Sequence, residues 1–424
     1  MQSLRGTKDI LPEEITSWQD IYYKVQQLFN KYNYNEIRTP IFEYTDLFFR
    51  SIGSDTDIIN REMYSFKDKG ERNITLRPEG TASIARAYIT NKMHKHCKVN
   101  RLWYLGPMFR YERPQKGRQR QFHQLGIECI GSSSPLADTE IIRIADKILQ
   151  TFYLDHYSIE INSLGNLEER AMYREKLKEY LNPYEKDLDE DSKKRLVNNP
   201  LRILDSKNLQ VKEILSSAPR LTTFLKSKSM NHFYKVCEHL AYLNIPYVIN
   251  EKLVRGLDYY NYTAFEIKTD QLGAQETICG GGRYDKLIEQ LGGPATPSVG
   301  WAIGIERLLM LVKDKPYCSS KQLNIYIIAQ GAESQKQAWN IIKIIEECNI
   351  NFHLDLTEYS LTKKLGQANL LNAQVCFIIA EEEIKNNYIT AKWLKNSSQQ
   401  RIEFPYLKAY INAHKYLLNK KVAQ

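Results

Sequence analysis

The sequence predicts an α+β fold, in which helices flank an antiparallel sheet, a helical segment is inserted into this core, and a smaller α/β domain follows it. Three observations lead to this prediction. Residues 101–128 have the pattern of a long hairpin, with an apolar strand, a polar loop and an alternating strand. Residues 166–240 are rich in charge and contain several helical patterns without strand alternation. Beyond residue 320 strands and helices alternate, which indicates a sheet with helices on both faces.

Length and composition are those of a globular protein with more than one domain. The 424 residues suffice for two or three domains, and 42% of them are hydrophobic while 26% are charged. We expect a core of residues 1–320, with the insertion at about 166–240, and a second domain of residues 321–424. The formal charge of +9 suggests a polyanionic partner, although a mildly basic enzyme without such a partner fits it equally well.

Cysteine usage and hydropathy exclude several classes of protein. The seven cysteines lie far apart without a Cys-x-x-Cys pair, so we predict neither a zinc ribbon nor a disulfide framework and expect a reducing compartment. His94 and His96 have no cysteine or carboxylate at ligand spacing, so we predict no metal site. The chain contains no run of about 18 apolar residues and no charged-then-apolar leader, so we expect no membrane span and no targeting peptide.

The N-terminal elements are predicted from hydrophobic spacing. Apolar residues recur at three- and four-residue steps over 18–32 and predict a helix that ends at Asn33. Residues 36–40 then predict a short strand. Residues 63–66 and 74–76, with a charged turn between them, predict a second hairpin.

A helix is predicted to begin after the segment Arg77-Pro78-Glu79-Gly80-Thr81. Thr81 is a suitable N-cap for a helix over 82–89, and Glu79 would lie close to its positive end. Taken alone, the segment can therefore be explained as a helix start without any binding role.

The hairpin 101–128 carries more chemistry than any other segment. Because side chains alternate along a strand, Phe122, Gln124, Gly126 and Glu128 share one face of its second strand. Arg110 ends the first strand, and four cations follow in the loop: Arg113, Lys116, Arg118 and Arg120. A solvated, charged hairpin is one interpretation. An arginine beside a carboxylate and an amide is also suited to a small zwitterion and a phosphate.

Two later segments combine glycines with charged residues. Arg255 precedes Gly256 and two tyrosines, and could be an ordinary paired arginine. Glycines 280–282 place bare backbone before a helix that we expect near Tyr284, where a ligand could approach closely. Residues 298–307 run from a strand into a helix and end in Gly-x-Glu-Arg.

The remaining elements follow from the same patterns. We predict helices at 138–152, 334–347 and 361–371, and strands at 157–164, 263–268, 324–329, 352–355 and 375–380. No glycine-rich loop follows the strand 324–329, so we expect no nucleotide site in the second domain. From residue 321 onward the chain has 13 basic and 9 acidic residues, which leaves a net charge of +4.

The twenty residues from Phe109 to Glu128 resemble the second signature motif of class II aminoacyl-tRNA synthetases, in the form found in the histidyl-tRNA synthetase family. The segments 77–81 and 253–260 resemble two further signatures of this family, and 304–307 resembles the third class II motif. The resemblance spans the whole chain. It implies a class II catalytic core, a homodimer formed through the first helix and the strand before Pro40, and an anticodon-binding domain after residue 320.

The resemblance also implies the roles of individual residues. For catalysis it implies Arg110 and Arg255, which would contact the α-phosphate of ATP. For histidine binding it implies Glu79, Gly80, Thr81, Arg110, Gln124, Glu128, Arg255, Tyr259 and Tyr260, with the amino group at Glu79, Thr81 and Gln124 and the imidazole at Glu128 and Tyr260. For ATP it implies Arg110, Glu112, Phe122 against the adenine and Arg307 at the γ-phosphate. For the tRNA acceptor stem it implies Arg113, Lys116, Arg118 and Arg120.

The implied activity is ATP-dependent ligation of L-histidine to tRNA(His) through a histidyl-adenylate, with release of AMP and diphosphate. ATP would be a substrate and Mg²⁺ a cofactor, and the compartment would be the cytoplasm or the plastid stroma. One alternative is a catalytically inactive paralogue that regulates histidine biosynthesis, but such chains usually lack the Arg255 segment and the basic second domain. Another class II synthetase would need a pocket other than Glu128 with Tyr259 and Tyr260.

Overall fold

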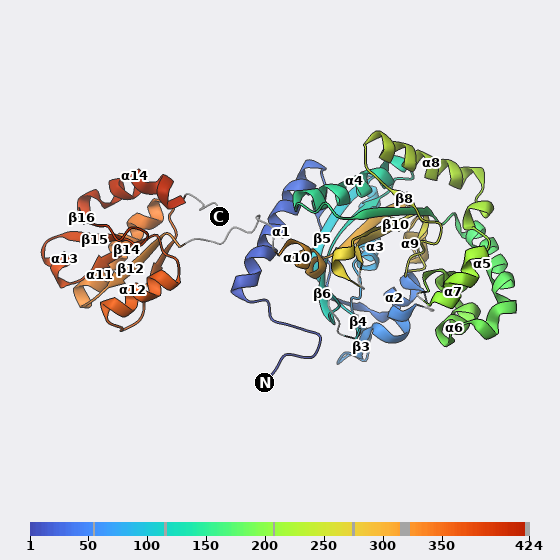
Figure 1. Ribbon diagram of the computed structural model, residues 1–424, viewed down its shortest axis with the longest axis horizontal. Helices are drawn as coiled ribbons and strands as arrows, with labels where there is room; N and C mark the ends of the chain where they lie inside the picture. Colours follow the sequence, from blue (N-terminus) through green and yellow to red (C-terminus); the bar gives the residue numbers. More distant parts are fainter. Residues whose placement is uncertain (54–55, 114–116, 207, 274–275, 314–322, 420–424) are drawn as a thin grey trace. The chain divides into compact units, whose positions relative to one another are not determined.

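Two large sheets organise the chain, one in each of two units that comprise residues 1–317 and 318–424 (Figure 1). The structure is a computed structural model and describes all residues except 54–55, 114–116, 207, 274–275, 314–322 and 420–424. The predicted boundary between the two domains, at residues 320 and 321, therefore lies outside the described residues, as does Lys116. The two units are described separately.

The sheet of the first unit has eight strands and is antiparallel except at its two edges. In their order across the sheet the strands are β1 (Asn35–Glu36), β5 (Asn100–Phe109), β6 (Gln121–Ile130), β11 (Ser298–Gly304), β10 (Thr277–Arg283), β9 (Asn261–Lys268), β7 (Ser158–Ser163) and β8 (Val248–Ile249). β1 pairs in parallel with β5, and β8 in parallel with β7. β5 and β6 form the long hairpin that the sequence predicts, with Phe109 opposite Gln121.

Alternation along β6 divides its side chains between the two faces of the sheet. Leu125, Ile127 and Cys129 are buried in the main hydrophobic core. This core also contains apolar residues of four helices: α1 (Pro12–Lys31), α4 (Pro135–Thr151), α8 (Ser227–Tyr242) and α10 (Ile305–Val312). The even-numbered residues of β6 consequently point to the opposite face, where the polar side chains are found.

Smaller elements cover this opposite face. They comprise a three-stranded sheet of β2 (Phe42–Tyr44), β4 (Asn73–Leu76) and β3 (Tyr64–Lys67), the helices α2 (Thr45–Ile52), α3 (Thr81–Thr90) and α9 (Leu287–Gln290), the π-helix η1 (Ile58–Glu62), and the 3-10 turn η2 (Met93–Lys95). The 3-10 turn η7 (Asp270–Leu272) instead packs with α10 in the main core. The predicted hairpin of residues 63–76 is confirmed as β3 and β4, which are antiparallel. The predicted strand 36–40 is wrong in extent, because only Asn35 and Glu36 pair with β5.

Helices and 3-10 turns connect β7 to α8, as predicted for the insertion. They are α5 (Leu167–Leu181), η3 (Asn182–Asp187), α6 (Glu190–Asn198), η4 (Pro200–Asp205), α7 (Leu209–Ile214), η5 (Leu215–Ser217) and η6 (Leu221–Phe224). Figure 1 shows α5, α6 and α7 grouped together in green at one end of the unit. α8 instead packs on α4 within the main core. We therefore use the term insertion for residues 166–226.

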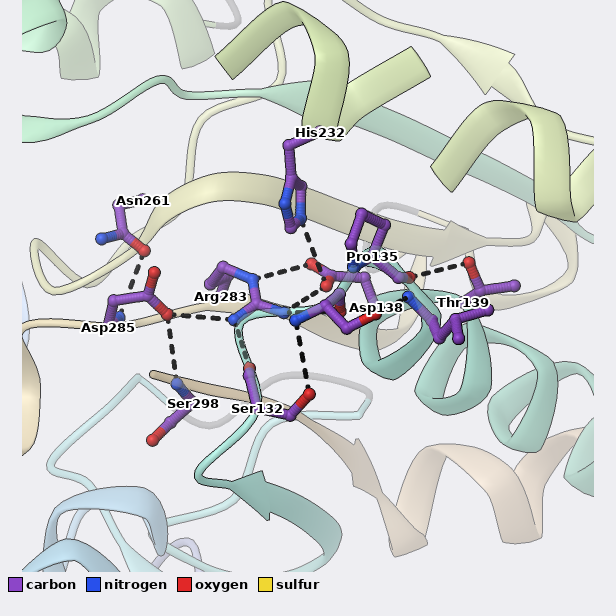
Figure 2. Close-up of polar contacts among 11 residues, drawn as sticks. Ser132, Pro135, Asp138, Thr139, His232, Asn261, Arg283, Asp285 and Ser298 are labelled. Atoms are coloured by element: carbon purple, nitrogen blue, oxygen red, sulfur yellow. Dashed lines mark hydrogen bonds and ion pairs between the residues drawn. The ribbon is translucent and has the colours of Figure 1, made fainter. Parts of the chain in front are cut away.

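A buried ion cluster joins the sheet to α4 and α8 (Figure 2). The guanidinium of Arg283, at the end of β10, binds Asp138 of α4 through Nε and Nη2, and Asp285 through Nη1. It also donates to the carbonyls of Ser132 and Ser134. On the other side of Asp138, His232 Nε2 of α8 lies 3.3 Å from the carboxylate. Five polar contacts thus occupy the five N–H groups of an arginine that is 1% exposed.

The second unit is a five-stranded sheet with helices on both faces. Its strand order is β13 (Phe352–Leu354), β12 (Ile325–Ala329), β14 (Val375–Ile379), β15 (Tyr388–Trp393) and β16 (Gln399–Glu403), of which the first three are parallel. α11 (Ala332–Glu347) and α14 (Leu407–Asn419) pack with one set of strand residues, and α12 (Leu361–Leu370) with the other. α13 (Glu381–Lys385) and η8 (Phe404–Tyr406) complete the unit.

The predicted α+β class is confirmed, and two local predictions are corrected. Glycines 280–282 lie inside β10 and not in a loop before a helix, and the next helix, α9, begins at Leu287 and not near Tyr284. β15, β16 and α14 are not predicted by the sequence patterns. No helix in the described part of the chain has both the length and the apolar character needed to cross a bilayer.

Candidate active site

A pocket opens on the polar face of the large sheet, above a floor of small residues. In register across the strands, Gly126 of β6 lies opposite Ala302 of β11, and Ala302 opposite Gly280 of β10. Tyr104 of β5 and Glu266 of β9 flank this row on its two sides. The absence of large side chains in the middle of the row leaves space above the sheet, and the two flanking side chains form walls.

The glycines of the floor make room for the protein's own side chains. A Cβ added at Gly280 would overlap the guanidinium of Arg255, and one at Gly126 would overlap the ring of Tyr104. Likewise, a Cβ at Gly300 would overlap the Glu128 carboxylate. Gly280 thus makes room for Arg255 and also lines the pocket. Approach of a ligand to this glycine stays a prediction.

Arg255 lies on this floor, held by a carboxylate. Its Nη1 pairs with Glu266, and its guanidinium lies 5.5 Å from the centre of the Tyr260 ring. Burial alone would lower the pKa of Arg255. The charge of Glu266, together with Tyr260 and Tyr259, acts in the opposite direction, so that the pKa is raised overall. The group is therefore a permanent cation. Arg255 Nε is buried and has no hydrogen-bond partner within the described part of the chain.

Three more arginines line the pocket, from the hairpin and from α10. Arg110 Nε donates to the carbonyl of Pro78 (2.9 Å), and its guanidinium lies 5.2 Å from the centre of the Phe122 ring. Arg307 Nη1 donates to the carbonyl of Thr277 (2.7 Å). Arg118 Nε is 3.1 Å from Glu112 Oε2. All of these side chains line the pocket.

The arginines repel one another. The pKa of Arg307 is lowered by burial and then by the charges of Arg118 and Arg110, which outweigh the opposite effect of Glu112. Such convergence of like charges costs free energy in an empty site and favours a bound polyanion. The arrangement is therefore suited to the phosphates predicted for Arg110, Arg255 and Arg307.

The pocket is also lined by Glu79, Thr81, Gln124, Tyr259 and Tyr260. Gln124 Oε1 is a buried acceptor for which the described residues provide no donor. The Tyr259 and Tyr260 rings lie 4.6 Å apart, and both residues are 5% exposed. An unsatisfied acceptor beside buried phenols is suited to a small ligand with N–H donors.

The side chain that caps the start of α3 is Glu79 and not, as the sequence predicts, Thr81. Its carboxylate accepts hydrogen bonds from the amides of Thr81 and Ala82, at 2.7 Å each. Glu79 therefore caps α3, whereas Thr81, predicted as the N-cap, is the first residue of the helix after the N-cap Gly80. Burial raises the pKa of Glu79 although these two bonds lower it.

Glu128 lies below the pocket and is not one of the described residues that line it. Its Oε1 accepts a hydrogen bond from the Thr81 hydroxyl (2.8 Å), and its Oε2 is bonded to the Tyr284 hydroxyl. Burial raises the pKa of Glu128 to about 8, with these two hydroxyls acting in the opposite direction. Each carboxyl oxygen can accept more than one hydrogen bond, so the contact with an imidazole predicted for Glu128 remains a prediction that these two bonds do not exclude.

The loop cations predicted to contact tRNA are partly engaged within the protein. Arg120 lies over the ring of Tyr111, with 3.9 Å between the guanidinium and the ring centre. Arg118 pairs with Glu112 and lines the pocket, and Arg113 is exposed. Lys116 lies outside the described residues.

Tyr104 and Glu306 line the pocket but were missed in the sequence. Glu306 accepts hydrogen bonds from the amide and ring of His123 (2.9 Å each to the nearer oxygen), which fixes β6 against α10. Tyr104 fills the spaces left by Gly80 and Gly126. Gly126, on the strand opposite Tyr104, could have indicated that a large side chain lies over it. The sequence does not pair the two residues, because the eleven-residue connection between Phe109 and Gln121 does not fix the strand register.

A metal ion bound by protein side chains needs several donor groups close together. No group of three or more His, Cys, Asp or Glu side chains suited to a metal ion occurs among the residues that the structure describes. Among these residues no all-protein cage exists for the Mg²⁺ implied by the resemblance, and the cationic charge of the pocket lining comes from arginines.

Comparison with known proteins gives consistent similarities along the chain. The family model described as histidyl-tRNA synthetase matches residues 6–308, and the one described as anticodon binding domain matches residues 324–414. The chain is 58% identical to the chloroplastic histidine–tRNA ligase of Gracilaria tenuistipitata var. liui, over 95% of this chain and 96% of that one. It is 51% identical to the corresponding protein of Pyropia yezoensis, over 100% and 97%. A solved structure of apo S. aureus histidyl-tRNA synthetase matches with a TM-score of 0.81 and 37% identity, over 97% of this chain and 100% of that one.

Proposed function

The chain belongs to the histidyl-tRNA synthetase family and ligates histidine to tRNA, and we propose that the reaction passes through a histidyl-adenylate with release of AMP and diphosphate. The observation that carries the proposal is the pocket itself. Its lining combines four arginines with Gln124, Tyr259 and Tyr260, and Arg255 lies against the ring of Tyr260. Such a site can hold a polyanion and a small zwitterion next to each other.

In the first step a carboxylate oxygen of histidine attacks the α-phosphorus of ATP. The new O–P bond forms as the bond from the α-phosphorus to the bridging oxygen breaks, and diphosphate leaves. We assign the α-phosphate to Arg110 and Arg255, the γ-phosphate to Arg307, the adenine to Phe122 and further ATP contacts to Glu112. No protein nucleophile is needed, because alignment of the reactants and neutralisation of charge lower the barrier.

The polar and aromatic side chains of the pocket would select histidine. We assign its amino group to Glu79, Thr81 and Gln124, and its imidazole to Glu128 and Tyr260, with Tyr259 as a further contact of the amino acid. Support for this comes from the unpartnered Oε1 of Gln124 and the burial of both tyrosines. An analogue that lacks the matching N–H group leaves buried polar groups of the site without a hydrogen-bond partner. Such a site can discriminate against this analogue in kcat/KM by roughly 10⁴.

In the second step a hydroxyl of the terminal ribose of tRNA(His) attacks the carbonyl carbon of the adenylate, and AMP leaves. Arg113, Lys116, Arg118 and Arg120 would contact the acceptor stem, and the second unit would contact the anticodon. The relatives from Gracilaria and Pyropia are named chloroplastic, which supports the plastid stroma over the cytoplasm as the place of action.

We also propose that the chain acts as a homodimer. Ile41, Phe42 and Tyr44 follow Pro40 directly and are 42%, 60% and 58% exposed. Phe66, on the same small sheet, is 49% exposed. Exposed apolar side chains gathered on one sheet support a surface that a second copy covers. Sedimentation of the full-length chain should give twice the mass of one chain.

The decisive experiment is ATP–diphosphate exchange with each of the twenty amino acids, followed by charging of tRNA(His). Histidine alone should support exchange, and charging should require both histidine and ATP. Exchange with a different amino acid would overturn the assignment of the pocket. Charging of tRNA(His) without any histidine-dependent exchange would argue against a free adenylate intermediate.

A further inference from the structure

The segment 255–262 has two sides, and this carries an inference that rests on the function proposed above. Arg255, Leu257, Tyr259 and Tyr260 contribute side chains to the pocket. Residues 256, 258 and 260 form hydrogen bonds with side chains of the insertion. Tyr262 forms hydrogen bonds with Leu164 and Gly165, the two residues directly before the insertion. One side of the segment thus faces the substrates, and the other faces the insertion.

Two arginines and an asparagine of the insertion make these bonds. Arg170 Nη1, on α5, donates to the carbonyl of Tyr260 and to that of Asp258 (3.2 Å). Arg202 Nη2, on η4, donates to the carbonyl of Gly256 (2.5 Å). Asn199 donates to Asp258 Oδ1 (3.1 Å). The donors come from the insertion, and most of the acceptors are backbone carbonyls whose positions determine where Arg255 and Tyr260 point.

The segment is also tied at its end and on its other flank. The amide of Tyr262 donates to the carbonyl of Gly165 (2.8 Å), and the carbonyl of Tyr262 accepts from Leu164 (2.6 Å). Tyr262 has a φ of 48°, an uncommon value for a non-glycine residue. The amide of Asp258 donates to the carbonyl of Ile52 (3.2 Å) at the end of α2. The segment is therefore held between α2 and the insertion.

The base of the insertion is fixed at one buried carboxylate. Glu169 accepts from the amide of Asn166 (2.8 Å) where the insertion begins, and from the amide of Lys226 (2.7 Å) where it ends. It also accepts from the hydroxyl of Ser229 (2.6 Å) on α8. Both ends of the insertion are thereby anchored to the core, which gives Arg170, one residue further along α5, a defined position.

A small cavity of about 20 Å³ lies between the insertion and the segment, lined among others by Arg170, Asn199, Arg202 and Asp258. The Nε of Arg202 is buried and lacks a partner among the described side chains and backbone groups. This volume has room for about one water molecule. The contact between insertion and segment is mixed, because apolar side chains such as Leu201 and Val254 also line this cavity.

From this geometry we infer that Arg170 and Arg202 are positioning residues for histidine activation. They act through Arg255 and Tyr260 by holding the backbone of the segment that carries them, and neither arginine touches the substrates. The insertion is thus a structural part of the amino-acid site. Any change that displaces the insertion, including contact with a bound tRNA, changes the rate of adenylate formation.

The test uses full-length Arg170→Met and Arg202→Met, which keep the apolar stem but remove the donors. Each should lower the kcat/KM of histidine-dependent exchange by about 10- to 100-fold, because a displacement of about 1 Å at reacting groups has effects of that size. The KM for histidine should rise more than the KM for ATP. Arg170→Lys, which retains a charge and one donor, should recover part of the loss.

The matched control is Arg174→Ala, one turn further along α5. Arg174 is half exposed and pairs with its neighbour Glu175, so exchange should stay within about twofold of the unmodified chain. Each variant is assayed at a temperature at which circular dichroism shows it to be folded. If one Met variant does not fold, the other carries the test.

Coupling to Arg255 distinguishes positioning from general stabilisation. In Arg202→Met combined with Arg255→Ala, the Arg202 change should cost less than threefold beyond Arg255→Ala alone, because Arg202 holds the carbonyl of Gly256 and the neighbouring Arg255 side chain is already missing. Full additivity, or unchanged exchange in both Met variants, would overturn the inference. Failure of the proposed function is recognisable separately, since the unmodified chain and Arg174→Ala would then show no histidine-dependent exchange at all.

Discussion

Arg255 and Arg283 have similar sequence surroundings but opposite environments in the folded chain. Each is next to a glycine and is followed by tyrosine and aspartate within five residues, and each pairs with a buried or half-buried carboxylate. All five N–H groups of Arg283 are bonded to protein acceptors (Figure 2). Arg255 retains a buried Nε with no partner among the described residues and lines a pocket.

The difference shows how a structural arginine can be distinguished from a binding one. A guanidinium whose donors are all occupied has nothing left for a ligand, and removing it leaves buried acceptors without a donor. A guanidinium with an unoccupied donor beside a cavity is incomplete until a ligand arrives. Pairing with a carboxylate does not separate the two cases, because both arginines have it.

Two buried carboxyl groups show the same contrast in their pKa values. Burial would raise the pKa of Asp138, but the charge of Arg283 and the bond from His232 lower it to about 2. Burial raises the pKa of Glu128 to about 8, because its partners Thr81 and Tyr284 are neutral hydroxyls. At neutral pH Asp138 is therefore a buried anion paired with the guanidinium of Arg283, whereas Glu128 is mostly protonated.

The largest expected effect comes from breaking the complete cluster. Arg283→Met should lower the free energy of unfolding by about 3 to 5 kcal/mol, because it leaves Asp138 buried without its main counter-charge. Denaturant unfolding measures this change. The double variant Arg283→Met with Asp138→Leu removes both charges and should recover a large part of the loss. A loss below about 1 kcal/mol in the single variant would mean that the cluster does not hold the layers together.

A smaller free-energy effect, but on catalysis, is expected at the incomplete site. Arg255→Ala should reduce ATP–diphosphate exchange at least about 10²-fold, since one preorganised contact typically contributes roughly 3 to 4 kcal/mol in the transition state. The free energy of unfolding should change less than in Arg283→Met. Arg255→Lys keeps the charge without the planar fork, so its exchange rate should lie between those of the unmodified chain and Arg255→Ala. Near-normal exchange by Arg255→Ala would make Arg255 a structural residue like Arg283.

The smallest effect on histidine binding is expected for Glu128→Gln. Because Glu128 has a pKa of about 8, the amide removes little charge at pH 7, and histidine affinity should change by about 1 kcal/mol or less. A raised carboxyl pKa favours the folded state only while the group is protonated. The unmodified chain should therefore lose stability as pH rises from about 4.5 to about 8.

The pH dependence of stability in Glu128→Gln tests the difference in pKa between Glu128 and Asp138. Relative to the unmodified chain, Glu128→Gln should become steadily more stable over the same pH range, since glutamine does not ionise. Thermal unfolding of both chains at several pH values measures the difference. A constant difference from pH 4.5 to 9 would show that Glu128 ionises in the folded chain as it does in water.

The sequence by itself determined the elements and much of the site. Periodicity located α1, α4, the β5–β6 hairpin and the parallel strands of the second unit, because their core-facing residues recur at fixed steps. Alternation along β6 also placed Phe122, Gln124, Gly126 and Glu128 on one face, as the structure has them. The edge strand β16 was not predicted, because only Ile402 of its five residues is buried and little apolar alternation remains.

Only the tertiary structure decided which polar side chains are satisfied by the protein. The glycines of β10 make room for Arg255, which belongs to a segment more than twenty residues earlier, and the register that aligns them is set by strand pairing. The same holds for Tyr104 beside Gly126 and for Glu128 beneath Thr81. The roles of Arg283 and Arg255 differ for this reason. Hydrogen-bond satisfaction depends on atoms that are distant in the chain, and no local pattern encodes them.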